Sequence, residues 1–274
     1  MNLEQKVAGH YTHGALAQAI REAVAASGKD LDRLTPQDLA PIDQFHLGGA
    51  EATAALFAQV APSAGARWLD IGSGLGGPAR HLALTYGCTV TGIDLTAEYV
   101  AVANDLAARV GLAGKVSFRQ GSALNLPFEA ASFDGASLLH VGMNIEDKAA
   151  LFAGVHRVLR PGGVFAIYDV MRVGTAALEF PVPWAAGPET SFVATPAAYR
   201  AALTEAGFTV TGERDRTAAA LAVLSAAQAR IAAEGRPALG LHILFGADAA
   251  AKSANLARNL KSGIVAPTEM IARA

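Results

Sequence analysis

The sequence predicts an α/β fold in which a mostly parallel sheet of seven strands has helices on both faces and the last strand runs antiparallel. Three observations lead to this prediction. Short apolar runs alternate with helical patterns between residues 66 and 213, a glycine-rich turn joins the first run to its helix, and one more apolar run stands at 268–273. Strands that alternate with helices are typical of a parallel sheet covered on both faces.

The composition allows one large domain and argues against several classes of partner. Of the 274 residues 52% are hydrophobic, and 22 Lys and Arg stand against 24 Asp and Glu, which gives a net charge of −2. This balance gives no reason to expect nucleic acid or an acidic membrane as a partner. No signal peptide or membrane span is apparent. The single cysteine, Cys88, cannot form an internal disulfide and fits a reducing compartment, so we expect a cytoplasmic protein.

The residues before the first predicted strand lie outside a minimal sheet and are long enough to cover it. We expect a helix over 3–26 that breaks near 11–14, a short unit at 31–41, a loop at 43–49 and a helix over 50–60. We therefore divide the chain into an N-terminal helical lid, residues 1–60, and a second domain over residues 61–274.

The turn after the first predicted strand, 66–71, has the pattern of a nucleotide-binding loop. The strand is apolar except for Arg67 and Asp70, and four glycines follow within six positions: Gly72, Gly74, Gly76 and Gly77. Pro78 then suits the first turn of a helix. Such a turn lets a ligand approach the backbone closely and offers it free N–H groups. Three of the glycines match G-x-G-x-x-G, the fingerprint of dinucleotide sites.

Two carboxylates distinguish the ligands that this turn could bind. Asp94 ends a second apolar run about twenty residues later, where a carboxylate can accept hydrogen bonds from a ribose. That position suits NAD and S-adenosyl-L-methionine (SAM) equally. Asp70 lies beside the turn itself and would repel a pyrophosphate, whereas it suits a ligand that carries an ammonium and a sulfonium. The two residues together favour SAM.

The rest of the chain continues the alternation of strands and helices. We expect helices over 97–110, where Thr96 is the cap, 146–159, 196–206, 218–233 and 241–260, the last of them weakened by Gly246. Strands are expected at 115–120, 133–139, 164–170, 208–213 and 268–273, with the last one antiparallel at or near one edge. A segment rich in Pro, Gly and aromatic residues, 171–195, reads as an insertion after the fifth strand.

Several motifs in this order resemble the class I SAM-dependent methyltransferases. Residues 69–77 are similar to their first motif, L-D-I-G-S-G-x-G, residues 121–128 to the segment that touches adenine, and residues 159–163 to the lead-in to the fifth strand. The segments 43–49, 140–144 and 183–192 resemble the sarcosine/dimethylglycine N-methyltransferase-like group, which is related to the ubiquinone/menaquinone-pathway enzymes. The resemblance implies a Rossmann-like sheet with SAM as cofactor and S-adenosyl-L-homocysteine (SAH) as product.

The motifs and the resemblance predict the cofactor contacts. The expected set is Gln44, Asp70, Gly72, Ser73, Gly74, Gly76, Asp94, Leu95, Ser122, Ala123 and His140. Ser122 departs from the family, which usually has Asp there, and an uncharged hydroxyl accepts a hydrogen bond from adenine more weakly. The Ala123 N–H is the alternative contact. For Gln44, a solvated place in its loop is the alternative.

The acceptor is expected on the same side of the sheet, under the lid and the insertion. The predicted contacts are Tyr11, His13, His46, Met143, Asn144, Trp184 and Glu189. His140 ends the fourth strand and is the candidate general base, or else it packs beside SAM. Arg80 is expected to orient backbone or acidic neighbours. No His, Cys, Asp or Glu cluster has metal-ligand spacing, so we predict no metal.

The sequence thus predicts an enzyme that transfers a methyl group from SAM to an N or O atom of a small molecule by in-line displacement. A Rossmann-fold NAD(P)-dependent oxidoreductase and a SAM-binding protein without transferase activity are the alternatives. The sequence leaves open the identity of the acceptor and the choice between monomer and homodimer.

Overall fold

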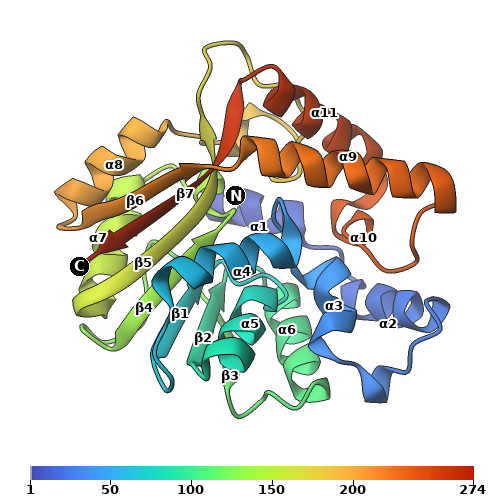
Figure 1. Ribbon diagram of the computed structural model, residues 1–274, viewed down its shortest axis with the longest axis horizontal. Coiled ribbons are helices and arrows are strands. Elements are labelled where there is room, and N and C mark those ends of the chain that lie inside the picture. Colours follow the sequence, from blue (N-terminus) through green and yellow to red (C-terminus); the bar gives the residue numbers. More distant parts are fainter. Residues whose placement is uncertain (1) are drawn as a thin grey trace.

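A seven-stranded sheet in the order β3-β2-β1-β4-β5-β7-β6 runs through the protein (Figure 1), whose computed structural model describes residues 2–274. The strands are β1 (Arg67–Ile71), β2 (Thr89–Asp94), β3 (Val116–Gln120), β4 (Phe133–Leu139), β5 (Leu159–Arg172), β6 (Thr209–Asp215) and β7 (Val265–Arg273). β1 to β5 pair in parallel, and β7 lies antiparallel between β5 and β6. The predicted α/β fold is confirmed, with its antiparallel last strand one place inside the edge.

Helices cover both faces of this sheet because the buried strands are apolar on both sides. In β1, Trp68 packs into one hydrophobic cluster, while Leu69 and Ile71 pack into another on the opposite face, as the two-residue period of a strand requires. α4 (Gly49–Val60), α5 (Gly77–Tyr86) and α6 (Ala97–Arg109) contribute to the first cluster, α7 (Lys148–Val158) and α8 (Pro196–Glu205) to the second. Thr96 stands at the N-cap of α6, but its side chain makes no capping hydrogen bond with any described residue.

Ahead of α4, residues 2–48 of the predicted lid form four short elements that pack on the rest of the chain. They are α1 (Leu3–Tyr11), α2 (Leu16–Ala26), η1 (Leu31–Arg33) and α3 (Pro36–Asp43), so the predicted helix over 3–26 is broken where expected. The start of α2 has no cap of its own, and Glu98 on α6 supplies one. Its carboxylate accepts hydrogen bonds from the backbone N–H groups of His13 at 2.6 Å, Gly14 at 3.0 Å and Leu16 at 2.8 Å. A residue of α6 therefore holds the start of α2.

The segment between β6 and β7 forms helices that differ from the prediction. α9 (Thr217–Glu234) agrees with the helix predicted over 218–233, but the prediction of one helix over 241–260 is wrong. Gly246, with φ 70° and ψ −154°, ends α10 (His242–Phe245), and a turn of 3₁₀ helix leads into α11 (Ala249–Lys261). α10 packs near α2, and Figure 1 shows α9 and α10 on the same side of the molecule as α2 and α3. Between residues 2 and 274 no helix has both the length and the apolar character that a membrane crossing requires.

A buried ion pair joins the lid to the helix that follows the glycine turn. Arg80 on α5 donates through Nη2 to Asp43 Oδ2 at 2.8 Å and to the Leu75 carbonyl at 2.6 Å, and only 1% of its surface is exposed. The expectation that Arg80 orients acidic and backbone neighbours agrees with these contacts. Because both charges are out of water, each depends on the other for its solvation.

We expect Arg80→Leu to lower the free energy of unfolding by about 3–5 kcal/mol, since it leaves the Asp43 carboxylate buried without its partner. Urea denaturation measures this change. Arg200→Ala is the control, because it breaks the half-exposed pair with Glu213 and should cost at most about 1 kcal/mol. Equal losses in the two variants would show that the buried pair has no special role.

Candidate active site

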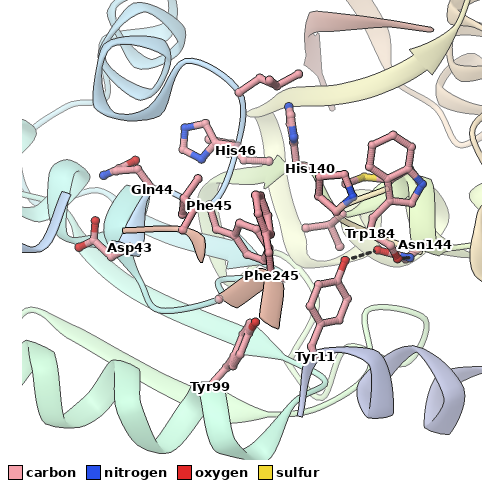
Figure 2. A pocket seen from close by; sticks show the side chains of 18 of the residues that line it. Tyr11, Asp43, Gln44, Phe45, His46, Tyr99, His140, Asn144, Trp184 and Phe245 are labelled. Atoms are coloured by element: carbon pink, nitrogen blue, oxygen red, sulfur yellow. Dashed lines mark hydrogen bonds between the residues drawn. The ribbon is translucent and has the colours of Figure 1, made fainter. Parts of the chain in front are cut away.

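A cavity of about 700 Å³ opens at the carboxyl ends of β1, β2 and β4. The lid, the strand ends, the insertion after β5 and the helices α9 to α11 all contribute to its wall (Figure 2). Most of the residues predicted for the site line this one cavity: Tyr11, Gln44, His46, Asp70, Gly72, Ser73, Gly74, Asp94, Leu95, Ala123, His140, Met143, Asn144 and Trp184. The remaining four, His13, Gly76, Ser122 and Glu189, do not.

The glycine turn brings backbone to the cavity where a side chain would not fit or would fill it. Gly72 and Gly74 have φ of 65° and 52°, a region that disfavours other residues. A Cβ on Gly72 would lie 2.3 Å from the side chain of Val141, whereas a Cβ on Gly74 would meet no described atom within 4 Å. At Gly76, which does not line the cavity, a Cβ would lie 2.3 Å from the ring of Phe118, so this glycine is needed for packing. Gly74 therefore leaves the open space that a ligand needs.

The Asp70 carboxylate has one oxygen without a partner. Oδ1 accepts a hydrogen bond from Ser137 Oγ at 2.7 Å, but Oδ2 is buried and has no hydrogen-bond partner among residues 2–274. Burial raises the pKa of Asp70 to about 7; the Ser137 hydrogen bond opposes this shift and the charge of Asp94 adds to it. A buried acceptor without a donor is costly, so a ligand ammonium would be stabilised here.

Asp94 holds the glycine turn and still has lone pairs for a ligand. Oδ2 accepts from the Gly74 N–H and Oδ1 from the Thr96 N–H, both at 2.8 Å. Each carboxylate oxygen can accept a second hydrogen bond, so a ribose diol could bind alongside. Burial raises the pKa of Asp94, and the backbone hydrogen bonds oppose that shift. The unpaired Asp70 oxygen, this carboxylate and the open space at Gly74 together fit SAM.

The residues expected near the adenine lie in two different surroundings. Ala123 lines the cavity, but the Ser122 hydroxyl bonds to Glu4 on α1 and accepts from the Leu124 N–H at 3.0 Å. The lid thus occupies the hydroxyl for which an adenine contact was predicted. That contact stays a prediction.

His46 and Gln44 are held by a buried network around Thr53. Thr53 Oγ1 donates to Gln44 Oε1 at 2.6 Å and lies 2.9 Å from His46 Nε2, which also lies 3.1 Å from the Gly49 carbonyl oxygen. Because a carbonyl can only accept, Nε2 of His46 carries a proton. Burial lowers the pKa of His46 to about 4, so the ring is neutral at pH 7.

His140 lines the cavity and has one ring nitrogen without a partner among the described residues. Its backbone lies in the left-handed region, with φ 54°, and its ring packs against Tyr168 at 4.8 Å and His46 at 5.9 Å between centroids. Nε2 is buried and bonds to no other residue that the structure describes. Burial lowers the pKa of His140 well below its usual value, with a smaller contribution from His46, so this ring is neutral too.

Asn144 joins three elements at the part of the cavity wall where the acceptor is predicted. Its Oδ1 accepts from the Tyr11 hydroxyl at 2.8 Å, the dashed line in Figure 2, and its Nδ2 donates to the carbonyls of Trp184 at 2.8 Å and Thr190 at 2.9 Å. The side chain thereby links α1, the turn η2 (Gly142–Asn144) and the insertion. Trp184 is 2% exposed and donates through Nε1 to Ser191 Oγ, so it both packs the insertion and lines the cavity.

The structure does not bring His13 and Glu189 to the cavity. His13 is exposed, and its ring stacks on Tyr99 with 6.4 Å between centroids. Glu189 is exposed at the surface of the insertion. Their predicted contacts with an acceptor remain predictions. Within residues 2–274, no three His, Cys, Asp or Glu side chains come together in a way that could hold a metal ion.

Sequence reasoning missed the wall that α9, α10 and the turn before α10 provide. Phe245 on α10 lies 5.5 Å from Phe45 between ring centroids, with the ring planes tilted by 49°, and both residues are labelled in Figure 2. Val223, Leu224, Ala227 and Ile231 of α9 also line the cavity. Their spacing along one helix face was visible in the sequence, but the same spacing is typical of a helix that packs on a core.

We expect SAM affinity to decrease as the pH falls below about 7, by up to tenfold per pH unit, because protonation of Asp70 removes the charge that meets the ammonium. The free energy of unfolding of the ligand-free protein should instead increase as the pH falls. The reason is that the folded protein binds this proton more tightly than the unfolded chain does. Calorimetric titration from pH 5.5 to 8.5 measures the first effect. Asp70→Asn should remove the dependence and Asp105→Asn, outside the cavity, should keep it; a flat profile in the unmodified protein would refute the assignment.

We expect Gly74→Val to abolish SAM binding while the domain stays folded, because the new side chain would occupy the open space beside the turn. Gly28→Val is the matched control: Gly28 also has a left-handed φ, 73°, and open surroundings, but lies outside the cavity. Both variants carry a backbone strain of about 1–3 kcal/mol. Normal SAM affinity of a folded Gly74→Val protein in calorimetry would contradict this placement of the cofactor.

Comparison with known proteins agrees with the site. Residues 69–167 match the family described as a methyltransferase domain. The chain is 36% identical over 138 residues to methyltransferase GfsG of Streptomyces halstedii, a match that covers 50% of each chain. It is 36% identical over 129 residues to the erythromycin 3''-O-methyltransferase of Saccharopolyspora erythraea, which covers 45% of this chain and 42% of that one. The chain thus spans about half, or less, of the length of these curated relatives.

A solved structure is similar over most of the chain. Phosphoethanolamine N-methyltransferase 2 of Haemonchus contortus, in complex with SAM, superposes with a TM-score of 0.73 at 23% identity, over 89% of this chain and 58% of that one. At this identity the likeness shows the fold. The match over residues 69–167 and the motifs of the glycine turn thus support a class I methyltransferase domain with S-adenosyl-L-methionine as methyl donor, and the solved structure shows the same fold.

Proposed function

We propose that this chain transfers the methyl group of SAM to an N or O atom of a small molecule. The observation that carries the proposal is that one cavity holds two kinds of wall. One end has the glycine turn with the unpaired Asp70 oxygen, which suits the cofactor. The other is built from aromatic and apolar side chains of the lid, the insertion and the C-terminal helices, which a site for the cofactor alone would not need.

The residues of the chain act mainly by orientation and exclusion of water. SAM supplies a methyl group on a sulfonium, which is already a good leaving group, so in-line displacement needs little further activation. Alignment of two bound reactants can contribute up to about 7–11 kcal/mol in ideal cases. The bond between Tyr11 and Asn144 holds α1 over the site, while Trp184, Phe45 and Phe245 give it apolar walls. These contacts would keep water from the acceptor.

His140 would accept a hydrogen bond from a protonated acceptor atom. Its ring is neutral, which is the form that can accept a proton, and Nε2 bonds to no described residue. In the tautomer with its proton on Nδ1, Nε2 would accept a hydrogen bond from an acceptor N–H or O–H and orient the lone pair used for attack. Because burial disfavours the charged ring, His140 would orient the acceptor more readily than it would hold a full proton.

The relatives support the range of atoms in the proposal. The Saccharopolyspora erythraea relative is named as an O-methyltransferase and the Haemonchus contortus structure as an N-methyltransferase, so both acceptor atoms occur among similar proteins. The substrates of those proteins are their own, because the matches cover only part of them. We also propose a cytoplasmic location, which the single buried thiol, Cys88, supports because free thiols are typical of reducing compartments.

The proposal predicts that SAM raises the apparent melting temperature and NAD does not, since a ligand stabilises the state that binds it. SAH should then form when the protein and SAM are mixed with a panel of small amines, phenols and sugar-like natural products, followed by mass spectrometry. Gly74→Val provides the background rate. Stabilisation by NAD would favour an oxidoreductase, and SAM binding without SAH release from any panel member would favour a SAM-binding protein of another kind.

A further inference from the structure

One apolar face of α9 lines the cavity, although the start of the helix and Leu224 also pack against the hydrophobic core. Val223, Leu224, Ala227, Arg230 and Ile231 all line the cavity, and their spacing places them along one stripe of the helix. Val223 is 38% and Ile231 44% exposed, which is unusual for large apolar side chains of this protein. A side chain that packs on a core would be covered, so Val223 and Ile231 leave this part of the stripe open to a ligand.

The acidic and the basic residues that line the cavity come from different parts of the chain. Its carboxylates all belong to residues 1–147: Glu4, Asp43, Asp70, Asp94, Glu146 and Asp147. Its arginines, Arg230 and Arg236, both belong to the segment between β6 and β7, and no described lysine lines the cavity. The α9 side of the cavity is therefore positive, opposite in sign to the cofactor side.

Both arginines lack an acidic partner. Neither forms an ion pair with any residue from 2 to 274, although Glu234 lies one helical turn after Arg230. An arginine guanidinium can form two parallel hydrogen bonds to a carboxylate or phosphate. An apolar ligand that covers the stripe would remove water beside these charges and strengthen their attraction for an anion.

We infer that the methyl acceptor is an amphipathic acid, whose apolar body lies on the α9 stripe and whose carboxylate or phosphate is bound by Arg230 and Arg236. This inference rests on the proposed function and names its substrate class. An apolar neutral molecule would leave both guanidinium groups without a partner, and a small polar anion would leave the stripe uncovered. The acceptor class that matches both features has an apolar part and an anionic end.

The test uses three probes of equal chain length: octanoate, octyl phosphate and 1-octanol. Calorimetric titration of the SAH-loaded protein should show that at least one anionic probe binds about tenfold or more tightly than 1-octanol, the ratio expected for one hydrogen bond to a charged group. Comparison of the two acids distinguishes a carboxylate from a phosphate. If 1-octanol binds as tightly as both acids, or if no probe binds, the inference is overturned.

Variants locate the effect. Arg230→Gln/Arg236→Gln should remove the preference for the acids and leave the affinity for 1-octanol unchanged, whereas Ile231→Ser should weaken all three probes by a similar factor. Arg33→Gln/Arg214→Gln is the matched control, because both of its arginines are exposed outside the cavity and the change in net charge is the same. An undiminished preference in the first double variant would overturn the inference. SAM affinity, measured in the same variants, should not change. If the unmodified protein does not bind SAM at all, that result contradicts the proposed function and not this inference alone.

Discussion

Three turns of the sheet meet at Asp94, and the site is built around this residue. Its carboxylate binds the N–H groups of Gly74 and Thr96, and its carbonyl accepts from the Gly121 N–H at 2.9 Å. The turns after β1, β2 and β3 are thereby held in one arrangement at the carboxyl edge of the sheet. Such edges bind ligands in open α/β sheets because loops of neighbouring strands converge there. A single buried carboxylate thus fixes the geometry of the cofactor end.

The electrostatics of that end follow from burial. Asp70 and Asp94 provide the negative charge when they are ionised, and the neighbouring rings of His46 and His140 are neutral because burial lowers their pKa. No histidine charge therefore opposes a cationic ligand at pH 7. The same low-dielectric surroundings make the unpaired oxygen of Asp70 and the unpaired nitrogen of His140 costly without a ligand. The site is arranged to be completed by a positively charged partner.

Local patterns predicted the strands, the glycine turn and most of the residues that line the cavity at the carboxyl edge of the sheet, because each depends on residues close together in the chain. The acceptor end could not be predicted to the same depth. A stripe on α9 that faces a cavity has the same spacing as one that packs on a core. At the cofactor end too, one partner was beyond local patterns, because Ser122 bonds to Glu4, 118 residues away. Gly246 lies in an otherwise helical pattern, and its left-handed φ, which no pattern reveals, divides the expected helix in two.

α1 touches both compartments of the cavity. Near its start Glu4 bonds to Ser122 beside the cofactor end, and its last residue, Tyr11, bonds to Asn144 over the acceptor end. Nine helical residues form a rod of about 13 Å, short enough to move as one body. A rigid rod anchored at both ends cannot uncover one compartment and keep both anchors. A displacement of α1 as one body would therefore open both ends of the cavity together.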